Sequence, residues 1–293
     1  MSNWLKLEGD VCAVTGALGG MGAEICREFA RNGANVVLLD LDEEHLGLEI
    51  GKRFENLIAP EQIAEGKHVD CQEVVYKATD EGFDLRKIVP APTNTPVDGG
   101  PYITMGLAYG TSPDGTQSDV TIHRFSCVDK DKLAMWITPG SRHLGAFFDE
   151  YCQRGEDMPI SISIGLDPAV YMCCGFEAPT TPLGFNELQI AGALRGHAVE
   201  LADCVTVPQK RIANAEYVLE GYLMHDETIN EDVNGHGYAM PEFPGYTGGA
   251  KVCPVIKITA VTTRVNPIME SCIGPSHEHV SMAGIPTEAS IYK

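Results

Sequence analysis

Apolar and polar positions alternate in the first 40 residues as in a short β-α-β unit. Apolar runs predict strands at residues 11–14 and 35–40, and apolar side chains recur at helical spacing over residues 22–32. Gly33 follows that stretch, at a position where helices commonly end. We therefore predict a partial Rossmann-like segment over residues 1–60.

The pattern changes after a polar stretch that contains proline and glycine, and we place a junction at residues 61–70. Beyond it, β-branched runs separated by proline- and glycine-rich turns predict strands, and amphipathic runs predict helices. The predicted strands are residues 120–125, 132–137, 160–164 and 252–265, and the predicted helices are residues 144–152 and 188–194. Residues 71–293 are thus predicted to be an α+β domain with a β-rich, barrel-like centre.

Charge and composition narrow the classes of function. The 293 residues include 21 Lys and Arg against 41 Asp and Glu, a formal net charge of −20. We expect no nucleic-acid partner, because such binding needs cationic surface, and an anionic substrate would need a locally basic pocket. We expect no membrane association, because no apolar run reaches bilayer length. The ten scattered cysteines suit reduced thiols, which favours a cytoplasmic protein.

The glycines between the first predicted strand and helix suit a nucleotide. Gly16, Gly20 and Gly22 let the backbone approach a pyrophosphate, and Asp40 is placed to accept a hydrogen bond from a ribose hydroxyl. This segment resembles the start of the short-chain dehydrogenase/reductase family, and Asp40 would imply NAD. The chain has no Tyr-x-x-x-Lys pair to serve as that family's base. An NAD-linked oxidoreductase therefore remains an alternative.

Residues 240–246 (Met-Pro-Glu-Phe-Pro-Gly-Tyr) place a carboxylate among prolines, aromatic residues and glycine. Proline fixes φ and glycine permits tight turns, so we predict a rigid loop. We expect the carboxyl group of Glu242 to be desolvated there, which would raise its pKa toward that of a working acid or base. The plainer alternative is a surface turn with an incidental glutamate.

Several other segments combine with this loop into a specific pattern. They are residues 71–80, 90–96, 119–124, 139–145, 165–169 and 186–196. In order and spacing they resemble the UbiD family of prenylated-flavin-dependent decarboxylases, and most of all its branch acting on hydroxybenzoic acids such as gallate and protocatechuate. The resemblance implies a UbiD-like split-barrel core and non-oxidative decarboxylation of phenolic acids, a reaction that can in principle run in reverse.

The resemblance also implies catalytic roles. Loss of carbon dioxide from an aromatic acid leaves an aryl carbanion, which needs an electron sink, and prenylated FMN is the sink in this family. Arg124 matches the family's active-site arginine, which would hold the substrate carboxylate or its partner glutamate by bidentate contacts. Glu242 matches the acid that protonates the product carbon. Glu231 fits the second glutamate of a Glu-Arg-Glu network, although the following loop, residues 232–239, is longer than in some relatives.

The family anchors the flavin phosphate through a divalent metal, usually Mn²⁺, with K⁺ nearby. The ligand positions match Asp119, His143 and Glu187, a donor set that suits a hard or borderline cation. Asp119 replaces the asparagine of some relatives and adds negative charge. The residues expected to contact the cofactor are Thr121, Ile122, Arg124, Arg142, His143 and Glu187.

Plainer explanations exist for each of these residues. Taken alone, Arg124 would be interpreted as an ion-paired arginine on a strand, and His143 as a structural hydrogen-bonding group. Glu187 would be interpreted as a carboxylate that is favourable at the start of a helix. Residues 277–279 (His-Glu-His) look like a metal tract, but alternate ligands on a strand are common by chance.

Family members are longer, so we expect a core truncated at its carboxyl end, as a natural fusion, a fragment or an artefactual gene model. The expected partners are a small aromatic carboxylic acid, a flavin prenyltransferase that supplies the cofactor, and further copies of the chain in a homo-oligomer. A flavin-binding remnant without catalytic activity is the remaining alternative.

Overall fold

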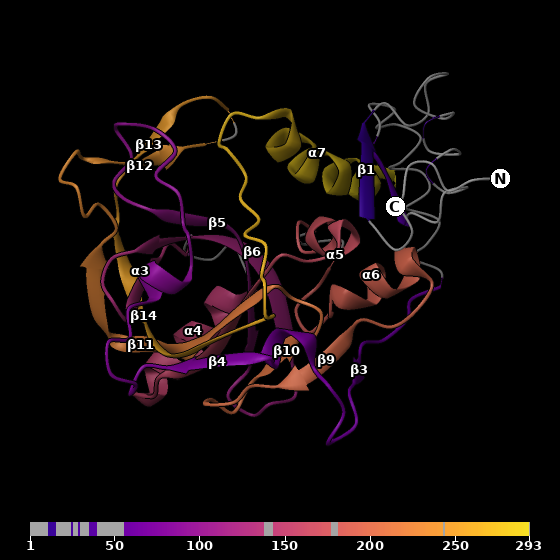
Figure 1. Ribbon diagram of the computed structural model, residues 1–293, viewed down its shortest axis with the longest axis horizontal. Helices are drawn as coiled ribbons and strands as arrows, with labels where there is room; N and C mark the ends of the chain where they lie inside the picture. The colour runs from indigo at the N-terminus through magenta and orange to yellow at the C-terminus, as the bar shows by residue number, and fades with distance from the viewer. Residues whose placement is uncertain are drawn as a thin grey trace.

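A closed antiparallel β-barrel forms the centre of this α+β molecule (Figure 1). The computed structural model describes residues 11–15, 25, 29, 35–39, 56–137, 143–176, 181–242 and 244–292. Its largest sheet has the strand order β11-β8-β5-β6-β7-β14-β4, and β11 also pairs with β14, which closes the barrel. These strands are β4 (Val74–Lys77), β5 (Tyr102–Thr111), β6 (Ser118–Cys127), β7 (Lys132–Met135), β8 (Met158–Ile164), β11 (Tyr217–Asn230) and β14 (Val252–Thr263).

Smaller sheets and helices surround the barrel. One sheet joins β3 (Glu61–Gln62), β9 (Glu200–Asp203) and β10 (Lys210–Ile212), and a hairpin joins β12 (Tyr238–Pro241) to β13 (Thr247–Gly249). The helices are η1 (Asp70–Gln72), α3 (Leu85–Ile88), α4 (His143–Arg154), α5 (Pro168–Cys173), α6 (Leu188–Arg195) and α7 (His277–Tyr292). Within the described residues, no helix is both long and apolar enough to cross a membrane.

Two apolar cores share strand β5. Ile103 and Ala108 belong to the barrel core, which also includes Leu144 and Phe147 of α4. Leu107 belongs to a second core, which β5 shares with α5, α6 and α7. A strand buried on both faces reads as a continuous apolar run rather than an alternating one. β5 therefore ties the barrel to the helices.

The strands and helices predicted beyond residue 70 are confirmed as β6, β7, β8, β14, α4 and α6. Two long barrel strands, β5 and β11, and helix α7 were not predicted. The interpretation of residues 277–279 as strand was wrong, because they form the start of α7. Residues on alternate positions of a helix point in different directions, so the tract is not a pair of ligands on one face.

The amino-terminal prediction is tested only in part. β1 (Val11–Thr15) and β2 (Asn35–Leu39) pair in parallel, as a β-α-β unit requires. Gly16, Gly20, Gly22 and Asp40 lie outside the described residues. The boundary at residues 61–70 stays a prediction, and β3, at its start, pairs with β9 of the larger domain.

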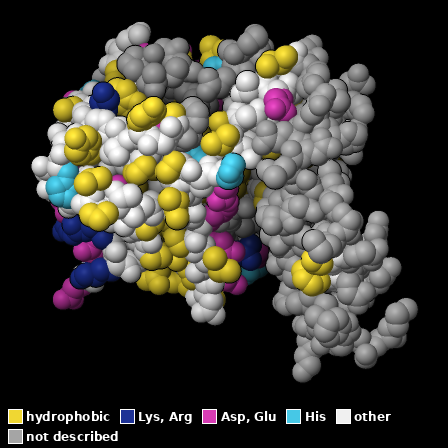
Figure 2. Space-filling view, turned by 90° about the horizontal axis from the view of Figure 1, so that it is seen from above, with side chains coloured by type: hydrophobic (Ala, Val, Ile, Leu, Met, Phe, Trp, Pro, Cys, Tyr) yellow, Lys and Arg dark blue, Asp and Glu magenta, His cyan; other side chains and the backbone are white. Residues whose placement is uncertain are grey.

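The face that carries β12, β13 and α7 shows many hydrophobic side chains among few charged ones (Figure 2). Tyr246, next to β13, is 78% exposed, and Ile273, before α7, is 59% exposed.

Candidate active site

Arg124, near the end of β6, lies between two glutamates. Its Nε and Nη2 atoms donate to Oε2 and Oε1 of Glu231 at 3.1 and 2.8 Å, and Nη1 donates to Oε1 of Glu242. Two parallel bonds to one carboxylate fix the plane of the guanidinium as well as its position. The structure thus brings together the three residues expected to form the Glu-Arg-Glu network.

Glu231 is fully buried, directly after β11. The Tyr102 hydroxyl and the Lys251 backbone N–H donate to its carboxylate at 3.3 and 3.0 Å, and the Ser126 hydroxyl donates to its backbone carbonyl at 2.7 Å. Burial disfavours a charged guanidinium, but the hydrogen bonds and charge of Glu231 more than offset this and raise the pKa of Arg124. Arg124 is therefore a permanent cation at a fixed place.

Glu242 follows β12 at the start of the tight turn into β13. Its N–H donates to the Tyr246 carbonyl at 2.9 Å, and the Gly245 N–H donates to the Glu242 carbonyl at 2.9 Å. Gly245 has φ +88°, which explains the glycine at this position. The predicted turn is present, although Met240 and Pro241 belong to strand β12. The Glu242 carboxyl group is not desolvated as expected, because its side chain is 34% exposed and paired with Arg124.

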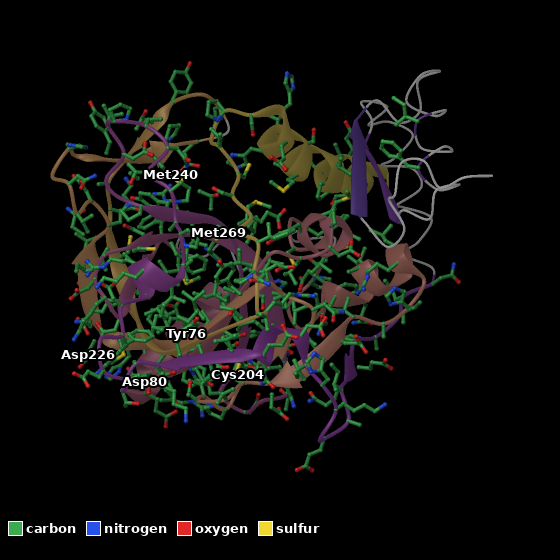
Figure 3. All side chains as sticks on the ribbon, viewed as in Figure 1. Tyr76, Asp80, Cys204, Asp226, Met240 and Met269 are labelled. Atoms are coloured by element: carbon green, nitrogen blue, oxygen red, sulfur yellow. The ribbon has the colours of Figure 1, made fainter. Side chains whose placement is uncertain are left out.

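Arg124 and Glu242 line a cavity of about 260 Å³. Met105, Met240 and Met282 form apolar parts of its wall, and Figure 3 labels Met240 below the β12–β13 hairpin. Such a cavity, apolar with a few charged groups, is typical of a site for a small organic ligand.

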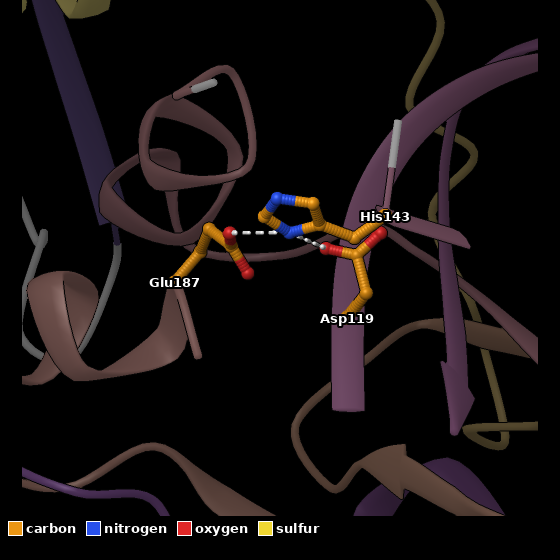
Figure 4. A group of neighbouring side chains, drawn as sticks. All are labelled: Asp119, His143 and Glu187. Atoms are coloured by element: carbon orange, nitrogen blue, oxygen red, sulfur yellow. Dashed lines mark ion pairs between the residues drawn. The ribbon is translucent and has the colours of Figure 1, made fainter. Parts of the chain in front are cut away.

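Three side chains of the kinds that bind metal ions meet near the beginning of β6. His143 Nδ1 lies 3.8 Å from Asp119 Oδ1 and 4.0 Å from Glu187 Oε1, so the imidazole sits between the two carboxylates (Figure 4). Asp119 and Glu187 are buried. Asp119 Oδ2 also accepts from the N–H of Leu144, at the start of α4. Two carboxylates and one imidazole are a donor set for a divalent cation.

The electrostatics of this cluster also favour a cation. Burial and the Asp119 charge raise the pKa of Glu187 to about 8. Among the described residues, Glu187 Oε2 has no hydrogen-bond partner, and the buried hydroxyl of Thr121 lacks one as well. Unpartnered buried polar atoms are rare, and they mark a place where a bound ion or ligand would complete the site.

Of the residues expected to contact a cofactor, Ile122 lines the cavity and Thr121 is buried one residue before it. Arg142 lies outside the described residues. Trp136 and His279 also line the cavity. His279 belongs to the tract at residues 277–279, which was considered as a possible metal site and not as part of this cavity, and its Nδ1 lies 2.8 Å from the Gly274 carbonyl. Trp136 was not predicted, because no local sequence signal marks it and the fold alone brings it to the cavity.

Residues 62–277 match the family model for the 3-octaprenyl-4-hydroxybenzoate carboxy-lyase Rift-related domain, UbiD. A gallate decarboxylase of Lactiplantibacillus plantarum is 59% identical over 252 residues, which is 85% of this chain and 51% of that protein. The chain therefore spans about half the length of that curated relative.

Solved structures of a decarboxylase and of a UbiD-class enzyme are also similar to this chain. The apo 3,4-dihydroxybenzoic acid decarboxylase of Klebsiella pneumoniae has a TM-score of 0.80 at 48% identity, and the match covers 85% of this chain and 51% of that one. The UbiD-class enzyme HmfF of Pelotomaculum thermopropionicum, in complex with FMN, has a TM-score of 0.75 at 33% identity, with 85% and 53% covered. The family match begins at residue 62, so the predicted Rossmann-like start at residues 1–60 lies outside it.

Proposed function

Since this chain belongs to the UbiD family, we propose that it decarboxylates hydroxylated aromatic acids without oxidation, using a prenylated flavin. The observation that carries the proposal is the arginine held between two glutamates in the wall of the cavity. This arrangement combines a fixed cation with a partly exposed carboxyl group, and protonation of a carbanion needs both orientation and a proton donor. The names of the relatives support gallate or 3,4-dihydroxybenzoate as the kind of substrate.

The cofactor proposal rests on the fit between the cluster on β6 and a phosphate-bound cation. Asp119, His143 and Glu187 would hold Mn²⁺ or a similar ion, and the unpartnered hydroxyl of Thr121 suits a phosphate oxygen. Asp119 and Arg124 are five residues apart, about 17 Å along an extended strand. That spacing suits a mononucleotide whose phosphate is remote from its rings. The K⁺ ion rests on the family resemblance alone.

Each residue of the triad has a separate task in this proposal. When bound, prenylated FMN would supply the electron sink for the carbon that loses carbon dioxide. Glu242 carries the proton that its carboxyl oxygen delivers to that carbon. Arg124 holds Glu242 in place, and buried Glu231 keeps the guanidinium charged and oriented. The reverse reaction would require Glu242 to accept the proton from the same carbon.

The partners of the whole protein belong to the same proposal. A flavin prenyltransferase would supply the cofactor, and further copies of the chain would form a homo-oligomer. Both follow from the family resemblance.

The test begins with co-expression of the chain and a flavin prenyltransferase, with Mn²⁺ and K⁺ supplied. We expect bound prenylated FMN, identified by absorbance and mass, and release of carbon dioxide from gallate or 3,4-dihydroxybenzoate. Folded protein that binds flavin and releases no carbon dioxide would instead identify a flavin-binding remnant. Folded protein without flavin would contradict the proposal.

A further inference from the structure

The charges around the cavity leave an anionic substrate without an evident partner. Glu231 and Glu242 both contact Arg124, the cation of the triad, so its guanidinium is already paired with two carboxyl groups. The chain as a whole carries a formal charge of −20. A carboxylate that approaches this cavity is therefore repelled unless another cation lies near its entrance.

Lys251 is placed to supply that charge. Its Nζ atom lies 5.8 Å from the centroid of the Trp136 ring, and Trp136 is part of the cavity wall. Lys251 is exposed and is not part of the cavity wall, so its charge stands beside Trp136 within reach of solvent. A cation over an aromatic face keeps its charge while its stem packs against the ring.

The backbone fixes Lys251 relative to the triad. Its N–H donates to Glu231 Oε1 at 3.0 Å, and its carbonyl accepts from the Glu231 N–H at 3.0 Å. Among the described residues, no carboxylate pairs with its ammonium group within 4.0 Å. The charge of Lys251 is thus held near the cavity and is not already matched by a protein carboxylate.

We propose that Lys251 is a positioning residue that attracts the carboxylate of the aromatic acid to the Trp136 wall of the cavity. This inference rests on the proposed function, since it assumes an anionic aromatic substrate. It makes the affinity for the acid depend on Lys251, whereas the affinity for the decarboxylated product, which has no carboxylate, does not depend on it.

The test is steady-state decarboxylation by the full chain loaded with prenylated flavin, with KM measured for protocatechuate and the inhibition constant measured for its product catechol. We expect Lys251→Met to raise KM for protocatechuate about three- to fivefold and to leave the inhibition constant of catechol unchanged. Lys251→Arg should retain the affinity for the acid. The gap between native protein and Lys251→Met should narrow as salt rises from about 0.05 to about 0.5 M.

Lys257→Met is the matched control. Lys257 is an exposed lysine of β14, six residues after Lys251 and therefore about 20 Å from it along an extended strand. An unchanged KM of Lys251→Met for the acid overturns the inference alone. Equal losses for acid and catechol also overturn it, since they would show a packing role. If the flavin-loaded native chain does not decarboxylate protocatechuate, the proposed substrate class fails, and the inference fails with it.

Discussion

Strand β6 contributes one residue, Arg124 or Asp119, to each of two groups of ionisable side chains, and the charges are compensated differently in the two groups. In the triad, Arg124 pairs with Glu231 and Glu242, so each charge has an opposite charge beside it. In the cluster, Asp119 and Glu187 lie beside His143, and Glu187 Oε2 has no partner among the described residues. The charges of the triad are matched within it, whereas the cluster leaves an unpartnered carboxylate oxygen that the proposed cation would contact.

The difference separates the two tasks of the proposed enzyme. A self-compensated triad keeps its geometry with or without ligand, which suits residues that must be oriented before chemistry begins. A cluster with excess negative charge binds a cation because it relieves desolvation and repulsion at the same time. Substitutions in the two groups should therefore change stability in opposite directions.

Arg124→Met should have the largest effect. It leaves Glu231 buried without its cation, and we expect a loss of about 3–5 kcal/mol in the free energy of unfolding, together with all decarboxylation. Chemical denaturation and carbon dioxide release measure the two losses. Arg154→Met, at the exposed end of α4, removes the same charge and should change stability by less than about 0.5 kcal/mol. Equal effects of the two substitutions would show that the triad is not a coupled unit.

Glu187→Gln should act in the opposite direction. Without divalent cations, the variant should be at least as stable as the native chain, by up to about 1 kcal/mol, because a desolvated carboxyl group is removed. Its affinity for Mn²⁺ should fall about 100-fold or more. Denaturation with a chelator present and Mn²⁺ titration measure these changes, with Glu81→Gln, an exposed acid, as control. Strong destabilisation of cation-free protein would contradict the distinction between the two groups.

Tyr102→Phe should weaken the triad slightly. It removes the hydroxyl that donates to Glu231 at 3.3 Å, which we expect to cost about 1 kcal/mol of unfolding free energy. Tyr217→Phe is the matched control, because that hydroxyl makes only a 3.5 Å contact with the Pro267 carbonyl. Thermal or chemical denaturation of both variants measures this loss, and equal free energies of unfolding for the two variants would show that the Tyr102 hydrogen bond does not stabilise the triad.

Glu270 provides a pH test outside both groups. Burial raises its pKa, against the opposing effect of Tyr171. The folded state therefore holds the proton more tightly than the unfolded state does, and stability falls as pH rises from the unfolded pKa to the raised folded pKa. Across that range, the free energy of unfolding should fall less steeply with rising pH for Glu270→Gln than for native protein. Glu81→Gln, an exposed acid that is not among the groups shifting the pKa of Glu270, should follow the native curve.

Much of the barrel could be predicted from the sequence, because β6, β8 and β14 are apolar and β-branched over their lengths. β11 was missed because its second half alternates with charged residues and passes through an irregular register between Leu223 and Thr228. α7 was missed because its apolar residues do not form one face and it contains Pro286.

The candidate site was predictable where a resemblance supplied the residues. The structure brings Arg124, Glu231 and Glu242 together, and Asp119, His143 and Glu187 together. Trp136 and Lys251 could not be predicted, since their contact joins the end of β7 to the start of β14 and depends on the closed barrel.

The most direct test of the proposed proton transfer compares native chain and Glu242→Gln at equal content of prenylated FMN. Glutamine keeps the shape of the side chain and removes its proton-donating carboxyl group. We predict that the free energy of unfolding changes by less than about 1 kcal/mol, while the rate of carbon dioxide release from protocatechuate falls by about 10²- to 10⁴-fold. Full turnover by flavin-loaded Glu242→Gln would contradict the account.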